Sequence, residues 1–335
     1  MAPRISIVSP SYQQADYLEE CLRSVQQQEG AEVEHIVVDG GSTDASPSIL
    51  ERHADHLAWW CSEKDKGQSE AINKGLAHAT GDIFNWLNSD DALLPGALRT
   101  VSEAFAADPD LLVFGGRLVH RKGDREEVFL PQNDASDVVQ LHTAPVIAQP
   151  ATFFRMEVLR TLGGVDPALR YVMDLELWWR FLFHFGSDRV RFVPVELAMF
   201  RLHDESKTVS AHAGFLQETA ELLHGMCEAV GLADLAQVLR VAHAPVPGLR
   251  GVPVPREQQD MVRRMAVHFL LKWNGRIHAR EQFMAMKALQ RCMGSEVPRY
   301  VADGMKERWM AVQAGLRAGS WTAYRIRRKL DHLRP

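Results

Sequence analysis

The segment at residues 81–91, GDIFNWLNSDD, limits the folds open to this chain more than any other segment. A short and mainly apolar run is entered through a glycine and left through four polar residues, Asn88, Ser89, Asp90 and Asp91. This pattern predicts a strand buried inside a sheet. Two carboxylates would then lie at the carboxyl end of that strand, which is the edge of an open α/β sheet where ligands bind.

Asp90 and Asp91 allow two interpretations. Adjacent acids at such an edge can hold a hard divalent cation that also binds substrate phosphates. Alternatively, the pair caps the next helix, since Pro95 suits a first helical turn. The segments that flank the pair favour the cation site.

Three earlier segments repeat the pattern of a strand followed by a polar loop and a helix. The predicted strands cover residues 5–8, 33–38 and 57–61, with a turn at residues 9–12 and a first helix that starts at Asp16. Such alternation implies a doubly wound, mainly parallel α/β sheet with right-handed crossovers. The loops after the four strands should therefore face one crevice. Their candidate ligand-binding residues are Tyr12, Asp39, Lys66, Asp90 and Asp91.

Further strands are predicted at residues 111–114, 151–155, 190–193 and 197–200, with a hairpin formed by residues 117–120 and 127–130. The weakly patterned residues 134–149 are interpreted as a substrate-facing loop. Asp174 opens a strongly apolar helix, where a negative charge stabilises the amino terminus by about 0.3–1 kcal/mol. From about residue 211, helices are predicted at 215–230, 233–241, 258–273 and 280–292. We therefore expect an α/β domain at residues 1–210 and a helical extension at residues 211–335.

Composition and missing motifs exclude several classes of protein. The formal net charge is -5 and 24% of the residues are charged, so no bulk basicity suggests nucleic acid as a partner. The four cysteines form no CxxC pair, which argues against a zinc site and leaves a reducing, cytoplasmic setting as the expectation. No GxGxxG follows the first strand and no GxxxxGK[ST] occurs, which disfavours dinucleotide oxidoreductases and P-loop kinases.

The sequence also bears on the membrane. The first strand begins so early that we expect no signal peptide, and no apolar run approaches the roughly 18 residues of a membrane span. Residues 299–335 carry nine Lys or Arg against three Asp or Glu. This basic segment either lies on an anionic membrane surface or forms a solvated helix.

Eight short motifs, in order, resemble the family 2 glycosyltransferases with the GT-A fold. The first four are residues 9–14 (SPSYQQ), 38–44 (VDGGSTD), 65–75 (DKGQSEAINKG) and 86–91 (WLNSDD). The match continues through residues 149–153 (QPATF), 163–166 (GGVD), 173–178 (MDLELW) and 201–203 (RLH). It covers roughly residues 4–209, and the C-terminal third lies outside it.

The resemblance implies a GT-A-type sheet and inverting transfer of a sugar from a nucleotide diphosphate donor. It implies a divalent metal, Mg²⁺ or Mn²⁺, and a glycan or lipid-linked glycan as acceptor, as in the synthesis of surface polysaccharide. A cytoplasmic enzyme is expected, with peripheral membrane contact through the basic segment as an open alternative.

The resemblance also assigns roles to single residues. Those around the base and ribose of the donor are Pro10, Tyr12, Asp39 and Lys66, with Asp90 approaching the ribose. Asp91 would bind the metal, and His203 would help to hold metal or diphosphate, although a lone histidine at a strand end can be purely structural. Asp174 would take the proton from the acceptor hydroxyl.

Three positions depart from the family pattern. Gln13 stands where many relatives have Asn, and Asn88 stands where the fuller acidic motif has Asp. Met173 precedes Asp174 where the common pattern has an acid, so Glu176 remains an alternative base.

Two other functions compete with glycosyl transfer. A non-catalytic nucleotide-sugar-binding protein would be favoured by loss of the acids, yet Asp91, Asp174 and His203 are all present. A nucleotidyltransferase normally has a glycine-rich, basic loop after the first strand, and residues 9–14 are neither glycine-rich nor basic.

Overall fold

The computed structural model describes residues 2–123, 125–129, 133–203, 207, 211–249 and 251–331. Contacts between residues divide the chain into two compact units. The first comprises Met1–Val138 and Pro145–His212, and the second comprises Val139–Ala144 and Ala213–Pro335.

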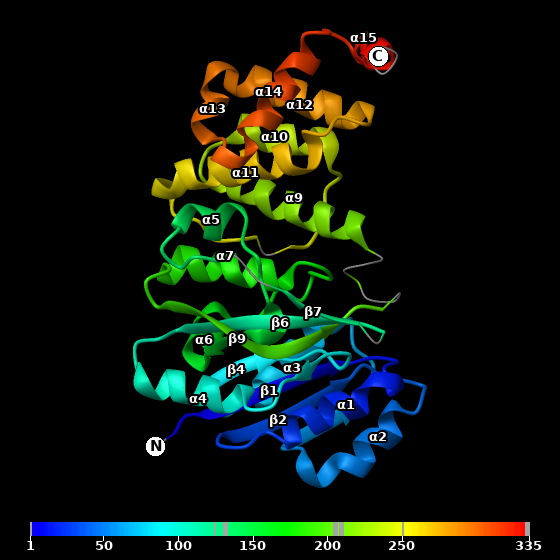
Figure 1. Ribbon diagram of the computed structural model, residues 1–335, viewed down its shortest axis with the longest axis vertical. Coiled ribbons are helices and arrows are strands. Elements are labelled where there is room, and N and C mark those ends of the chain that lie inside the picture. Colours follow the sequence, from blue (N-terminus) through cyan, green and yellow to red (C-terminus); the bar gives the residue numbers. More distant parts are fainter. Residues whose placement is uncertain are drawn as a thin grey trace. The chain divides into compact units, whose positions relative to one another are not determined.

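Within the described residues, nine strands form one sheet in the first unit, in the order β3-β2-β1-β4-β8-β6-β9-β5, with β7 paired to β6 (Figure 1). Their bounds are β1 Arg4–Ser11, β2 Glu32–Asp39, β3 Trp59–Ser62, β4 Ile83–Trp86, β5 Ala92–Leu93, β6 Val113–Lys122, β7 Arg125–Phe129, β8 Thr152–Arg155 and β9 Val190–Arg201. The first four strands pair in parallel, as do β6 and β9, whereas β5, β7 and β8 pair antiparallel to their neighbours.

The register of the parallel strands aligns their carboxyl ends. Ser11 at the end of β1 pairs with Asp39 at the end of β2, and Asp39 in turn pairs with Ser62 at the end of β3. The Leu87 amide, just after β4, donates to the Val8 carbonyl of β1 at 2.9 Å. The loops after the four strands therefore leave the same edge of the sheet, as the sequence predicts.

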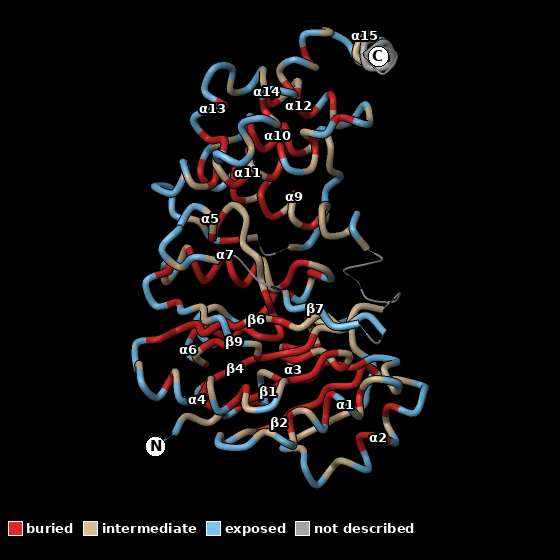
Figure 2. The backbone as a smooth tube through the Cα atoms, viewed as in Figure 1, coloured by how far each residue is buried: buried red, intermediate tan, exposed pale blue. Residues whose placement is uncertain are grey.

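Helices cover this sheet and bury their apolar faces on it (Figure 2). They are α1 Ala15–Gln26, α2 Ser46–His53, α3 Gln68–His78, α4 Ala97–Ala107, α6 Met156–Leu162 and α7 Met173–Phe185. In α1 the buried residues are Leu18, Cys21, Leu22 and Val25, which fall on one side of the helix. Gly75 lets α3 approach β1, because a β-carbon at this position would lie 2.4 Å from Val8 Cγ1.

Three sequence-predicted boundaries are wrong for physical reasons. β1 runs through the predicted turn to Ser11, and Pro10 fits there because β4 pairs with β1 only as far as Val8. The segments predicted as separate strands at 111–114 and 117–120 are one strand, β6, and those at 190–193 and 197–200 are one strand, β9. The break expected at each place is absorbed by a register shift between Gly115 and Leu118 where β6 pairs with β9.

The first helix begins at Ala15, one residue before the predicted start. The Ala15 amide donates to Asp44 Oδ2 at 2.9 Å, so an acid from the loop after β2 caps α1. The predicted hairpin of β6 and β7 is present, with Leu118 opposite Phe129, while Asp124 and Leu130 of the prediction lie outside the described residues. The weakly patterned segment contains the short helix α5 Val138–Thr143.

The second unit is helical. It contains most of α5, and the helices that follow in the chain are α9 His212–Ala229, α10 Ala233–Ala242, α11 Gln259–Asn274, α12 Arg280–Met293, α13 Val297–Tyr300, α14 Lys306–Leu316 and α15 Trp321–Asp331. The four helices predicted from the sequence correspond to α9–α12, and their buried side chains include Leu223, Leu239, Leu270 and Leu289. The Phe283 ring of α12 packs against the Trp321 and Tyr324 rings of α15 at centroid distances of 6.0 and 5.5 Å.

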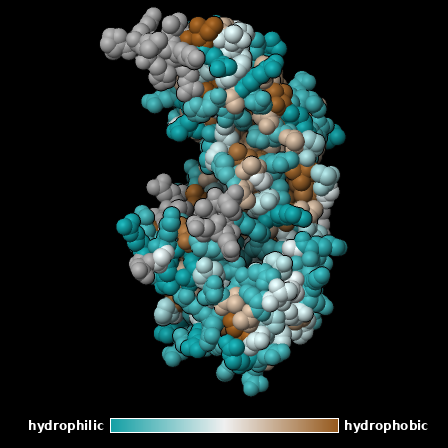
Figure 3. Space-filling model, turned by 90° about the vertical axis from the view of Figure 1, so that its right-hand side faces the viewer, coloured by the Kyte–Doolittle hydropathy of each residue, from teal (hydrophilic) through white to brown (hydrophobic). Residues whose placement is uncertain are grey.

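Hydrophobic side chains on the face shown in Figure 3 gather in small patches separated by hydrophilic surface. Among the described residues, no helix combines the length and the apolar character needed to cross a membrane. Residues 332–335 of the basic segment lie outside the described part of the chain.

Candidate active site

Asp90 and Asp91 occupy a tight turn between β4 and β5. The Asp91 amide donates to the Asn88 carbonyl at 2.9 Å, and β5 begins at the very next residue, Ala92. Helix α4 begins only at Ala97, after a further turn. The interpretation of the two acids as a cap for the next helix is therefore wrong.

The Asp91 side chain is buried, with 1% of its surface exposed. Burial and the neighbouring charge of Asp90 raise the pKa of the Asp91 carboxyl well above its usual range, although the Arg201 amide and the Asn88 side chain donate to it. A buried carboxylate beside a second acid is unfavourable when both are ionised. A cation bound at this place would reverse that balance and favour the ionised form of both acids.

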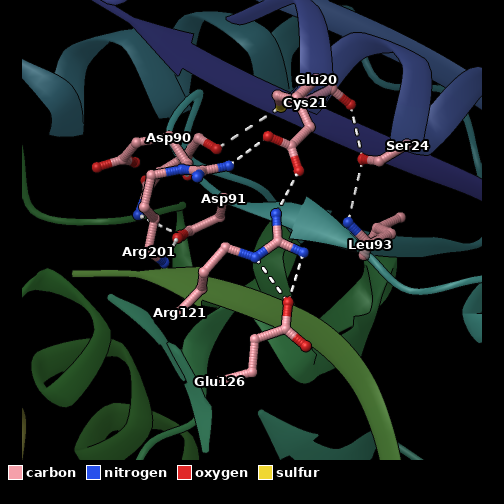
Figure 4. A network of polar contacts seen from close by, with 10 residues as sticks. Glu20, Cys21, Ser24, Asp90, Asp91, Leu93, Arg121, Glu126 and Arg201 are labelled. Atoms are coloured by element: carbon pink, nitrogen blue, oxygen red, sulfur yellow. Dashed lines mark hydrogen bonds and ion pairs between the residues drawn. The ribbon is translucent and has the colours of Figure 1, made fainter. Parts of the chain in front are cut away.

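The end of β9 brings Arg201 to this turn (Figure 4), and His203 follows two residues later in the chain. The Arg201 amide donates to Asp91 Oδ1 at 3.1 Å, and His203 Nε2 lies 3.0 Å from Asp90 Oδ2. The antiparallel pairing of β5 with β9 sets this approach, with Ala92 opposite Met199. Three of the residues predicted from the sequence, Asp90, Asp91 and His203, thus meet at one point.

The side chains at this point fit a hard divalent cation. Carboxylate oxygens are the preferred ligands of Mg²⁺ and suit Mn²⁺, and imidazole is a common second donor. In the described part of the chain, no group of three or more His, Cys, Asp or Glu side chains converges as a complete metal site. The protein therefore offers Asp91 with His203 nearby, and a substrate phosphate or water would have to supply the remaining ligands.

The nucleotide-binding candidates follow the same sheet edge. Asp39 is fully buried, and its carboxylate accepts from the Ser42 amide at 2.9 Å, the Ser42 hydroxyl at 2.5 Å and the Ser62 hydroxyl at 2.6 Å. Pro10 pairs with Val38 one residue before Asp39. The Tyr12 side chain is 61% exposed, which leaves its ring available to a ligand.

The loop after β3 completes this row. The Lys66 amide donates to Glu70 Oε2 at 2.6 Å, while Lys66 itself is exposed. Gly40 allows a close approach between two loops, because a β-carbon there would lie 3.0 Å from Asp65 Oδ2. The loop of Lys66 therefore packs against the loop that follows Asp39.

Gln13 joins the loops after β1 and β2. Within the described residues it is the one non-glycine residue with a positive φ, of 56°. Its side-chain oxygen accepts from the Thr43 and Asp44 amides at 3.2 Å, and its amide donates to the Ser42 hydroxyl at 2.7 Å. These bonds explain how a glutamine holds the left-handed backbone, a conformation that asparagine tolerates better.

Asp174 and Glu176 differ sharply in their surroundings, although both lie in the first turn of α7. Asp174 is half-buried and accepts from the Leu175 amide at 2.8 Å. The surrounding protein nonetheless desolvates its carboxyl strongly, which raises the pKa of Asp174 to about 6 even though backbone hydrogen bonds oppose the shift. Such a pKa lies near the range in which a carboxylate works as a general base at neutral pH.

Glu176 is completely buried and engaged. Its two oxygens lie 2.5 and 2.7 Å from Arg180 Nε and Nη2. The same guanidinium donates to the Leu162 and Gly164 carbonyls at 2.5 and 2.7 Å. Glu176 therefore serves in a bidentate ion pair that fastens the turn before α7, which disfavours it as a base.

Helix α3 is fastened to the same turn. Asn73 makes two hydrogen bonds with the backbone of Val165, at 2.8 Å to its carbonyl and 3.0 Å from its amide. The Ser69 hydroxyl donates to the Leu169 carbonyl at 2.6 Å.

Sequence reasoning missed three residues that build this site. Glu20 of α1 bonds to Arg201, and Asn73 fastens the turn before α7. Arg201 lies in the motif at residues 201–203, but the motif assigns it no role. Asn73 lies inside a motif of the family pattern, which is the signal that could have found it. Glu20 lies outside every motif and carried no such signal.

Known proteins resemble this chain in sequence and in fold. The family model described as glycosyl transferase family 2 matches residues 6–163. An uncharacterized glycosyltransferase of Mycobacterium tuberculosis is 32% identical over 181 residues, which cover 52% of this chain and 67% of the relative. A GalNAc(5)-diNAcBac-PP-undecaprenol beta-1,3-glucosyltransferase of Campylobacter jejuni is 30% identical over 131 residues, covering 38% of this chain and 42% of that protein.

Among solved structures, S. aureus TarS residues 1–349 in complex with UDP-GlcNAc matches with a TM-score of 0.62 and 15% identity, covering 95% of this chain and 93% of that one. At this identity the likeness speaks for the fold alone, and it confirms the expected GT-A-type sheet with C-terminal helices. The family model and the sequence relatives go further. The chain is a glycosyltransferase and belongs to glycosyltransferase family 2.

Proposed function

We propose that this enzyme transfers a sugar, with inversion, from a nucleoside diphosphate donor to an acceptor hydroxyl, and that it uses a divalent cation, Mg²⁺ or Mn²⁺. One observation carries the proposal. The buried carboxyl of Asp91, with Asp90 and His203 beside it, lies at the sheet edge to which four strand-end loops converge. That edge is where a nucleotide binds in open α/β sheets.

The charges at the turn suit a diphosphate leaving group. A divalent cation bound here would stabilise the negative charge that develops on the departing diphosphate. Asp91 would hold the cation, Asp90 would face the ribose, and His203 would support metal or diphosphate. Pro10, Tyr12, Asp39 and Lys66 would surround the base and ribose.

Asp174 is proposed as the base that accepts the proton of the acceptor hydroxyl. A carboxylate that works opposite the leaving group lets attack and departure occur on opposite faces of the sugar, which gives inversion. Its raised pKa supports this role, whereas the ion pair of Glu176 with Arg180 argues against Glu176 as the base.

The pH dependence of transfer tests the base. We expect kcat/KM to rise with pH along an ionisation with an apparent pKa of about 6, because Asp174 must be ionised to accept a proton. The measurement is initial rate against pH at low donor and acceptor concentration. Asp174→Asn should remove this limb from whatever residual rate persists, and an unchanged limb in that variant would assign the ionisation to another group.

The donor and acceptor classes are part of the proposal. The UDP-GlcNAc complex of the structural neighbour supports a nucleotide sugar as donor, and the name of the Campylobacter relative supports a glycan or lipid-linked glycan as acceptor. Synthesis of a surface polysaccharide or another glycan in the cytoplasm agrees with both.

A product assay separates this function from the two competing ones. Purified protein is incubated with a panel of nucleotide sugars, with and without candidate acceptors. We expect free nucleoside diphosphate that appears together with a glycosylated acceptor. Pyrophosphate as product would identify a nucleotidyltransferase, and binding without any product would identify a nucleotide-sugar sensor.

We also propose that the chain divides at about residue 210 and that the extension touches the cytoplasmic face of a membrane through its basic segment. Nine Lys or Arg residues against three Asp or Glu in that segment would attract anionic lipids.

Vesicle sedimentation tests this contact. The full chain should bind vesicles that contain anionic lipid, and deletion of residues 321–335 should reduce the bound fraction several-fold, since each basic residue near the surface contributes about 1 kcal/mol. Neutral vesicles serve as the control. Equal binding by the full and the shortened chain would remove the segment from the explanation.

A further inference from the structure

Arg201 is held at the acidic turn by two partners, one in the turn itself and one in α1. Its Nε donates to the Asp90 carbonyl at 3.1 Å, and its Nη2 lies 2.5 Å from Glu20 Oε2 of α1 (Figure 4). Its side chain is only 15% exposed. The guanidinium is therefore directed at the backbone of the turn and at Glu20, while the backbone amide of the same residue serves Asp91.

One face of α1 supports this arrangement. Tyr17 lies one turn before Glu20, and its ring lies 5.1 Å from the Arg201 guanidinium and 4.9 Å from the His203 ring. A helix places residues three apart on the same side. Helix α1 thus contacts Arg201, at the end of β9, and His203, just beyond it, which are the two residues that reach the turn of Asp90 and Asp91.

Glu20 is shared between two arginines. Arg121 of β6 lies 2.8 Å from Glu20 Oε1, and the same guanidinium bonds to Glu126 of β7 at 2.7 Å. Both oxygens of Glu20 are thereby engaged by cations, so its position is fixed from two directions. Glu20 does not itself approach Asp90 or Asp91 in any contact that the described residues show.

The Arg201 guanidinium could also take a second position, in which it would pair with a carboxylate of the acidic turn. Arginine forms bidentate pairs with carboxylates, and two carboxyl groups lie within the reach of this side chain. Without the charge of Glu20, the guanidinium would gain by turning toward Asp90 or Asp91. It would then compete with a cation for the same oxygens.

We propose that Glu20 is a positioning residue, which keeps the Arg201 guanidinium on the backbone of the Asp90–Asp91 turn and so leaves the two carboxylates available to a metal-bound diphosphate. The proposal rests on the proposed function, because it presumes that metal and diphosphate bind at this turn. It adds a residue that acts through Arg201 and does not touch the substrate.

The test compares Glu20→Gln with Glu19→Gln by calorimetry, using Mn²⁺ together with UDP as the probe. Glu19 is the matched control, because it lies on the same helix and also pairs with arginines, Arg23 at 2.6 Å and Arg52 at 3.4 Å, away from Arg201. We expect Glu20→Gln to weaken Mn²⁺–UDP binding by roughly 10–100-fold, as loss of an outer-shell partner of a metal ligand does, and Glu19→Gln to bind as the unaltered protein does. Thermal unfolding should change little in both, since Glu20 is 47% exposed and exposed ion pairs contribute little stability.

A double variant distinguishes competition between the freed Arg201 guanidinium and the cation from a purely structural role of Glu20. If the freed guanidinium competes with the cation, Glu20→Gln combined with Arg201→Met should bind Mn²⁺–UDP more tightly than Glu20→Gln alone. No recovery in the double variant, or normal binding by Glu20→Gln, would overturn the proposal. Failure of the unaltered protein to bind UDP or any other nucleoside diphosphate together with Mn²⁺ would instead refute the proposed function, and the role of Glu20 with it.

Discussion

Asp174→Asn should lower the rate of sugar transfer by about 10²–10⁴-fold, which is the usual loss when a positioned general base is removed. The amide keeps the size and polarity of the carboxyl but is a very poor base. Donor and metal binding should stay nearly intact, since Asp174 is proposed to act on the acceptor alone. The measurements are the transfer rate at saturating substrates and donor affinity by calorimetry.

The raised pKa of Asp174 also predicts the direction in which Asp174→Asn changes the stability of the fold. The folded pKa of Asp174, about 6, lies above the unfolded value of about 3.9. The fold therefore favours the protonated carboxyl, and this contribution to stability is fully present below the unfolded pKa and is lost as pH rises through about 6. At pH 8 Asp174→Asn should consequently unfold at no lower temperature than the unaltered protein, which separates a catalytic role from a helix-terminal charge.

Glu176→Gln is the matched control. It removes the charge of a buried ion pair, and breaking such pairs typically costs about 3–5 kcal/mol, so we expect a loss of thermal stability. The rate per folded molecule should fall far less than in Asp174→Asn. A near-normal rate in Asp174→Asn with a collapsed rate in Glu176→Gln would move the base to Glu176, and near-normal rates in both would reject a carboxylate base in this segment.

Asp91→Asn is expected to weaken metal-assisted binding of a nucleoside diphosphate by at least tenfold, because the proposed metal ligand loses its charge. The same change should leave the protein without ligand at least as stable near neutral pH. The reason is that the pKa of Asp91 is raised, so its ionised form is disfavoured by the fold. Calorimetry of UDP binding with and without Mn²⁺, together with thermal unfolding, measures both effects.

Asp82→Asn provides the comparison for Asp91. Asp82 lies just before β4, at the opposite end of the same strand, where it accepts from the Arg4 amide at 2.9 Å. It should leave the metal dependence unchanged. If UDP bound with the same affinity with and without Mn²⁺ in both the unaltered protein and Asp91→Asn, the metal would have to be removed from the proposal.

The sheet edge was predictable because its signals are local. Each of the first four strands is a short apolar run that ends in a polar loop, and parallel pairing then aligns the ends by necessity. The later strands were less predictable. Gly115, Gly116 and Pro194 resemble breaks in a sequence, yet the pairing of β6 with β9 absorbs them in a shift of register that only the folded neighbours reveal.

The candidate site was predictable in its acids and not in their supports. The motif at residues 86–91 and the one at 201–203 indicated Asp90, Asp91 and His203, and the first and last of these are in contact. Glu20 meets Arg201 across 181 positions of the chain, and Asp44 caps α1 across 29. Contacts of that kind leave no periodicity or spacing to detect.

The two-point attachment of Asn73 to Val165 has a practical side. Helix α3 begins at Gln68, next to the loop that contains Lys66. Further along, its Asn73 is hydrogen-bonded to the turn that leads into α7 and Asp174. The turn has no room for a side chain at Gly164, because a β-carbon there would lie 2.3 Å from the Asn73 side-chain oxygen. A protein engineer who seeks a new acceptor should therefore treat α3 and this turn as one rigid unit. Positions chosen for randomised substitution should lie elsewhere.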